Sequence, residues 1–94
     1  MVSKDRLLRE FLSLVAIDAE SFHEGAMRDH MKKSLSALGL EVLEDDAPQK
    51  LREYGEEAGN LFARIPGTCP GRTLLFSSHM DTVKPGKGKK AVCQ

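Results

Sequence analysis

The sequence has no excess charge of either sign. Its 94 residues include 14 lysines plus arginines and 14 aspartates plus glutamates, so the formal net charge is zero. A chain with this balance has no overall electrostatic field that would recruit nucleic acid or an anionic membrane surface. We therefore expect neither as a partner.

Cysteines and long apolar runs are also scarce. Cys69 and Cys93 have no CxxC spacing, so they match neither a disulfide framework nor a zinc knuckle, and we expect reduced thiols. The longest apolar runs, such as residues 12–17, are far too short to cross a bilayer. The first ten residues carry charges where a signal peptide has an apolar stretch, so we expect a cytoplasmic location.

The bulk composition is that of an ordinary globular protein. Hydrophobic residues make up 40% of the chain and charged residues 30%, values that do not favour disorder. A length of 94 residues allows one domain at most and lies near the low end for a self-sufficient core. We expect one domain with a limited core.

Apolar residues at helical spacing predict two helices. Ser3 can cap the first, which fades around residues 17–18. Ser21 is placed to cap the second, and Glu24 three residues later completes a capping box. The second helix is expected to run to about Leu38, where Gly39 supplies a left-handed stop.

Three further segments predict strands, at residues 40–44, 60–65 and 73–77. Residues 45–58 look like an acidic surface excursion, and residues 84–94 like an unfinished loop. The apolar centre of residues 73–77 is typical of a strand buried on both faces. Two helices and about three to four strands predict the α/β class. They cover only one face of a sheet, so we expect the sheet to be incomplete.

His79 and Asp81 follow directly after the last predicted strand. Ligands bind beyond the carboxyl ends of strands in open α/β sheets. Neutral imidazole is a favoured zinc ligand, and a nearby carboxylate commonly accepts its other ring N–H. The pattern H-x-D alone is weak, because a surface histidine beside a turn-forming aspartate also produces it. The buried strand before the pair and the Pro-Gly turn after it favour a site.

The block from Leu74 to Gly86 resembles the first metal-site motif of the M20 family of metallopeptidases, particularly its peptidase T-like (tripeptide aminopeptidase-like) branch. Upstream segments resemble the same branch in the same order. They are residues 11–18, 21–27, 38–42 and 59–67. Several matching segments in order are more specific than any one of them.

The resemblance implies a zinc-peptidase-like three-layer fold, with His79 as a zinc ligand and Asp81 as the catalytic-site aspartate that orients it. In this family two zinc ions share a site, a water between them is the nucleophile, and a glutamate is the general base. The substrates implied are short peptides with a free N-terminus.

The family pattern also needs a bridging aspartate, a Glu-Glu pair, a further carboxylate and a second histidine, all downstream of the motif seen here. We therefore expect residues 1–94 to be the N-terminal portion of the catalytic domain, without the C-terminal half or the inserted lid through which many members dimerise. A shortened chain and an interrupted gene both remain open. We expect the 94 residues alone neither to bind zinc tightly nor to hydrolyse peptides.

Two alternatives remain open beside an aminopeptidase or tripeptidase. Related carboxypeptidases, deacylases and dipeptidases share the H-x-D motif. A non-catalytic fragment could instead pair with a full-length relative through an open sheet edge. His23 and His30 match no metal position of the family, and we expect neither to be a ligand.

Overall fold

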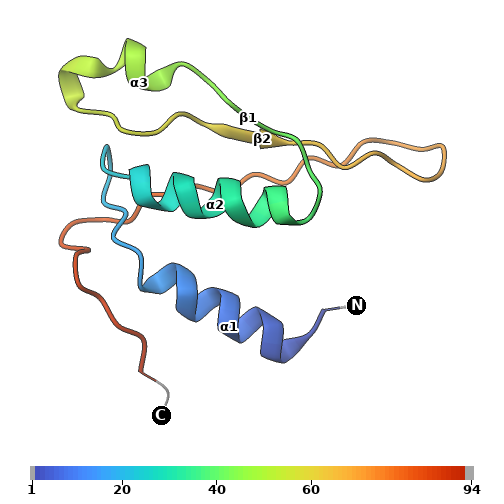
Figure 1. Ribbon diagram of the computed structural model, residues 1–94, viewed down its shortest axis with the longest axis horizontal. Helices are drawn as coiled ribbons and strands as arrows, with labels where there is room; N and C mark the ends of the chain where they lie inside the picture. Colours follow the sequence, from blue (N-terminus) through green and yellow to red (C-terminus); the bar gives the residue numbers. More distant parts are fainter. Residues whose placement is uncertain (1, 93–94) are drawn as a thin grey trace.

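The computed structural model describes residues 2–92, which form a mixed α/β structure (Figure 1). Two long helices lie beside a small antiparallel sheet, and short helical turns connect the two strands. In chain order the elements are α1 (Lys4–Val15), α2 (Gly25–Ala37), β1 (Val42–Glu44), α3 (Ala47–Lys50), a 3-10 turn (Arg52–Tyr54) and β2 (Leu61–Ala63). The predicted α/β class is confirmed.

Helix α1 begins as predicted. The Ser3 hydroxyl accepts a hydrogen bond of 3.3 Å from the backbone N–H of Arg6, which satisfies one of the free donors of the first turn. The helix ends at Val15, slightly before the predicted end. None of its side chains is buried, and Phe11 is exposed. The described part of the chain therefore leaves much of its apolar stripe uncovered, while Leu12, Leu14 and Val15 are half-buried.

Helix α2 begins at Gly25 rather than just after Ser21, so the predicted capping box is wrong. Phe22 has a φ of 67°, which turns the chain away from a helical path. The first turn instead receives a carboxylate from a distant segment, because Glu57 accepts from the Gly25 N–H at 3.2 Å. At the other end Gly39 has a φ of 83°, as its predicted role as a stop requires.

Strands β1 and β2 pair antiparallel, with Leu43 opposite Phe62. Asp45 closes the end of this pair, because its carboxylate accepts from both the backbone and the side-chain N–H groups of Asn60 at 2.8 and 2.7 Å. Helix α2 packs against both strands and buries Met27. Residues 45–58 are more ordered than predicted, since they hold α3 and the 3-10 turn.

The strand predicted at residues 73–77 does not form. The segment returns from the loop after β2 without pairing to any strand of the described chain (Figure 1). Leu75 and Phe76 are 91% and 89% exposed. A strand buried on both faces needs hydrogen-bonded neighbours and covering layers, and residues 2–92 supply neither at this place. The apolar pattern was identified correctly, but its partners are lacking here.

Two further sequence predictions concern the cysteines and membrane-spanning segments. Cys69 is a free, exposed cysteine, while Cys93 lies outside the described residues. Among residues 2–92, no helix has both the length and the apolar character needed to cross a membrane.

Candidate functional site

His79 and Asp81 are in direct contact. The Nδ1 atom of His79 lies 2.9 Å from the backbone carbonyl oxygen of Asp81 and 3.1 Å from its Oδ1. Both partners are acceptors, so Nδ1 must carry the proton and donate it. The lone pair of the neutral ring is then on Nε2. This is the tautomer in which an oriented histidine binds a metal ion.

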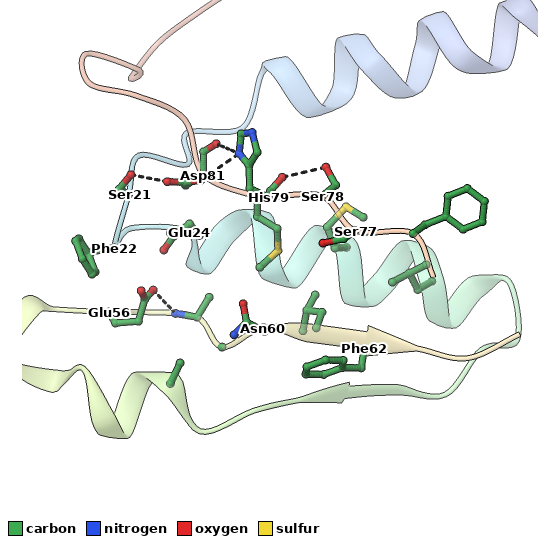
Figure 2. A pocket seen from close by; sticks show the side chains of 18 of the residues that line it. Ser21, Phe22, Glu24, Glu56, Asn60, Phe62, Ser77, Ser78, His79 and Asp81 are labelled. Carbon is green, nitrogen blue, oxygen red and sulfur yellow. Dashed lines mark hydrogen bonds and ion pairs between the residues drawn. The ribbon is translucent and has the colours of Figure 1, made fainter. Parts of the chain in front are cut away.

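The second oxygen of the Asp81 carboxylate is also engaged. The Ser21 hydroxyl donates to Asp81 Oδ2 at 2.5 Å, a contact between residues 60 positions apart (Figure 2). This hydrogen bond lowers the pKa of Asp81 from its ordinary value; partial burial opposes the shift, and the nearby His79 adds to it. Asp81 is therefore held as a carboxylate between a serine and a histidine.

The backbone around these side chains is fixed by a parallel bridge between Glu20 and Thr82. The Thr82 N–H donates to the Ala19 carbonyl at 2.7 Å. The buried carboxylate of Glu20 accepts from the Gly86 N–H at 2.9 Å. These contacts dock the loop after Asp81 onto the segment between α1 and α2.

An open pocket of about 770 Å³ lies beside the pair (Figure 2). Its walls come from the loop before α2 and the later turns of α2, from the segment around β2 and from the extended chain leading to His79. Residues from these walls include Ser21, Glu24, Met31, Glu56, Phe62 and His79. Burial and the adjacent Glu56 carboxyl raise the pKa of Glu24. The pocket thus combines an apolar floor with carboxyl groups and an accessible imidazole.

The residues present suit one metal-ligand position. The His79 side chain is 83% exposed, so its free ring nitrogen is accessible, and its other nitrogen has the carboxylate partner that zinc-binding histidines require. Zinc usually takes four ligands. Within residues 2–92, no group of three or more histidine, cysteine, aspartate or glutamate side chains is placed to hold a metal ion.

The other histidines lie elsewhere. His23 contacts Glu57 at 3.1 Å, and His30 contacts Glu10 at 3.3 Å. Both contacts are between partly exposed side chains, and neither histidine lines the pocket. Ser21 is the member of the site that the sequence interpretation missed. A local pattern suggested a helix cap, and a partner 60 residues away leaves no signal in one sequence.

The chain resembles solved peptidase structures over nearly its whole length. It is 39% identical to aminopeptidase PepT from Bacillus cereus ATCC 10987, with a TM-score of 0.88 over 99% of this chain and 24% of that one. It is 38% identical to a tripeptidase from Staphylococcus aureus subsp. aureus Mu50, with a TM-score of 0.82 over 93% of this chain and 22% of that one. These likenesses confirm the predicted resemblance to peptidase T-like proteins.

The chain is also similar in sequence to two longer proteins. The chain is 46% identical over all of its 94 residues to 24% of an uncharacterized protein, YqjE, of Bacillus subtilis (strain 168). It is 31% identical over 86 residues to a probable carboxypeptidase of Aspergillus terreus (strain NIH 2624 / FGSC A1156), covering 90% of this chain and 20% of the relative. The chain therefore spans about a quarter or less of the length of the proteins it matches. No model of a known protein family matches it.

Proposed function

Since the chain has the fold of part of a peptidase T-like protein of the M20 family, we propose that it supplies one zinc ligand, His79, and its orienting aspartate, Asp81, to a metallopeptidase that hydrolyses short peptides. The observation that carries this proposal is the bond from His79 Nδ1 to Asp81 beside an open pocket. It leaves a neutral ring nitrogen free at the site.

The roles of the two residues follow from their chemistry. Asp81 holds the proton on Nδ1 of His79, which keeps Nε2 unprotonated and directed at the metal position. Zinc, when bound, would lower the pKa of a water and polarise the peptide carbonyl. The apolar floor around Met31 and Phe62 suits peptide side chains. The general base and the other ligands would come from outside residues 2–92.

The proposal also predicts how the 94 residues behave in isolation. One histidine with its orienting aspartate cannot hold two zinc ions that each need about four ligands, so we expect this chain alone to be inactive and to bind zinc weakly. It would act as the N-terminal portion of a catalytic domain in a longer, cytoplasmic protein. Its substrates would be short peptides with a free N-terminus.

A chimera tests this proposal directly. The 94 residues would replace the matching quarter of Bacillus cereus PepT, with which they share 39% identity. We expect the chimera to hydrolyse a tripeptide and to lose this activity with His79→Ala. Asp81→Ala should lower zinc affinity or activity by roughly 10–100-fold, the usual effect of removing such a partner.

His30→Ala is the matched control, because it removes a histidine of the same chain that lies away from the pocket. This variant should keep the activity of the chimera. Full activity in the His79→Ala chimera would refute the assignment. So would a folded, zinc-loaded chimera that has no peptidase activity.

A carboxypeptidase is the second candidate, favoured by the likeness to the probable carboxypeptidase of Aspergillus terreus. The chimera cannot decide this point, because most of its substrate pocket would be that of PepT. The longer protein that contains these residues, assayed with peptides blocked at either end, would separate the two. A non-catalytic pairing role would instead appear as a stable complex when the chain is mixed with full-length YqjE.

A further inference from the structure

We infer that Ser21 is a positioning residue for the metal-ligand histidine. Its hydroxyl fixes the Asp81 carboxylate, and the carboxylate fixes the ring of His79. The inference rests on the proposed function, since it assumes that His79 binds a metal ion. It adds a residue from the loop before α2 to a site otherwise formed at the end of the extended segment.

The contacts form a continuous line. The Ser21 hydroxyl donates to Oδ2 of Asp81 at 2.5 Å, and Oδ1 of the same carboxylate accepts from Nδ1 of His79 at 3.1 Å (Figure 2). Hydroxyl-to-carboxylate bonds of this length are charge-assisted and stronger than neutral ones. Each carboxylate oxygen therefore has one partner, and the plane of the carboxylate is defined by both.

This serine bond matters because little else holds the ring. The His79 side chain is 83% exposed, so packing contributes little to its orientation. The χ2 torsion that rotates the carboxylate of an aspartate adopts a broad range of angles. A carboxylate held at one oxygen only could rotate away, and Nδ1 would then keep only its 2.9 Å contact with the Asp81 backbone carbonyl. The second bond, to Ser21, removes that freedom.

The backbone brings the two residues close together on a diagonal across the parallel bridge between Glu20 and Thr82. Ser21 follows Glu20 in the chain, and Asp81 precedes Thr82. Directly after Ser21, Phe22 adopts the left-handed region with a φ of 67°, a conformation that costs a non-glycine residue about 1–2 kcal/mol. Phe22 is held there by stacking on Tyr54, with ring centroids 5.6 Å apart. The surrounding structure thus stabilises a loop conformation that directs the hydroxyl at Asp81 rather than at the helix.

The first test reads the tautomer of His79 by ¹⁵N NMR of the 94-residue chain at a pH where the ring is neutral. The native ring should be protonated at Nδ1. Ser21→Ala should lower the ratio of Nδ1-protonated to Nε2-protonated ring several-fold, while Ser21→Thr, which keeps the hydroxyl, should retain the native ratio. Ser34→Ala is the control, because Ser34 contacts His30 and not His79. An unchanged tautomer ratio in Ser21→Ala would overturn the inference. So would a Ser21→Thr variant that folds like the native chain but has a lower ratio of Nδ1-protonated to Nε2-protonated ring.

The second test measures zinc affinity in the PepT chimera through a double-mutant cycle. Ser21→Ala should weaken zinc binding by about 10-fold, the lower end for a residue that acts through a ligand. It should have no further effect when Asp81→Ala is already present. An equal loss in both backgrounds would show that Ser21 supports the fold in general, and no loss in either would also refute the inference. If His79→Ala leaves zinc affinity unchanged, the proposed function itself fails, which keeps the two failures distinguishable.

Discussion

The buried carboxylate of Glu20 accepts a hydrogen bond of 2.9 Å from the backbone N–H of Gly86, 66 residues further along the chain. Glu20 is only 8% exposed, and a carboxylate is tolerated at such a place when a donor satisfies it. The contact matters for the site because the segment before Asp81 has no strand partner in the described chain. The loop after Asp81 therefore fixes the backbone of this aspartate, while Ser21 holds its carboxylate.

Gly86→Ala should loosen that loop. A Cβ atom at this position would lie 2.7 Å from Thr82 Oγ1 and 2.9 Å from the Val83 carbonyl, so the backbone would have to move. We expect amide exchange of Thr82, whose N–H is bonded to Ala19, to accelerate by about 10-fold or more, equivalent to roughly 1.4 kcal/mol.

The matched control is Gly67→Ala, where the nearest atom would lie 3.7 Å from the new Cβ, at an ordinary contact distance. Exchange at Thr82 should not change in this variant. A native exchange rate at Thr82 in Gly86→Ala would mean that the loop is not held by the contacts around Gly86.

Glu44 should make the stability of the chain depend on pH. Burial raises the pKa of this carboxyl, but bonds from Lys32, the Gly59 N–H and Arg28 outweigh it and lower the pKa to about 2 from 4.5. A lowered folded-state pKa means that the ionised group stabilises the fold above about pH 4.5. This contribution is lost as the pH falls toward 2. Urea unfolding followed by circular dichroism should show the loss in that window.

Glu44→Gln should remove most of this dependence. Lys32 and Arg28 lie 2.6 and 2.9 Å from the native carboxylate. The change removes this charged partner from both, and Arg28 keeps its ion pair with Asp29 at 2.7 Å. We expect a cost of about 1.5–3 kcal/mol at pH 7, the range for hydrogen bonds to charged groups, and a flatter curve between pH 5 and 2. Glu41→Gln, at an exposed position just before β1, is the control and should unfold like the native chain. A Glu44→Gln curve parallel to the native one would contradict the assignment.

The local parts of this fold could be predicted from the sequence, and the long-range parts could not. The Ser3 cap, the stop at Gly39 and the strand around Phe62 depend on neighbouring residues, and all three are confirmed. The spacing of Ser21 and Glu24 predicts a capping box, which the structure does not contain. The actual partner of Ser21, Asp81, is determined by tertiary structure.

The candidate site shows the same division. The adjacency of His79 and Asp81 follows from their spacing along an extended segment, and their contact is observed. The docking of Thr82 against Glu20 could not be predicted, because nothing in either segment specifies the other. The strand at residues 73–77 failed for a further reason, since a buried strand is a property of its neighbours as much as of its own residues.

Substitutions in that segment test whether the 94-residue chain is an incomplete structure. Leu75 and Phe76 are almost fully exposed, so in the isolated chain Leu75→Ser should cost little stability. It should instead reduce self-association, because exposed apolar segments promote it. In the PepT chimera the same residue would be buried in a completed sheet, and the change should cost roughly 2–5 kcal/mol, as for a large-to-small core substitution.

Sedimentation of the isolated chain and thermal unfolding of the chimera measure the two effects. Arg72→Ser, at an exposed position just before the segment, serves as the control and should be neutral in both proteins. A large stability loss in the isolated chain would mean that Leu75 is already buried there. A neutral result in the chimera would mean that residues 73–77 are not a core strand of the longer fold, and the proposal of an incomplete catalytic domain would then lose its structural basis.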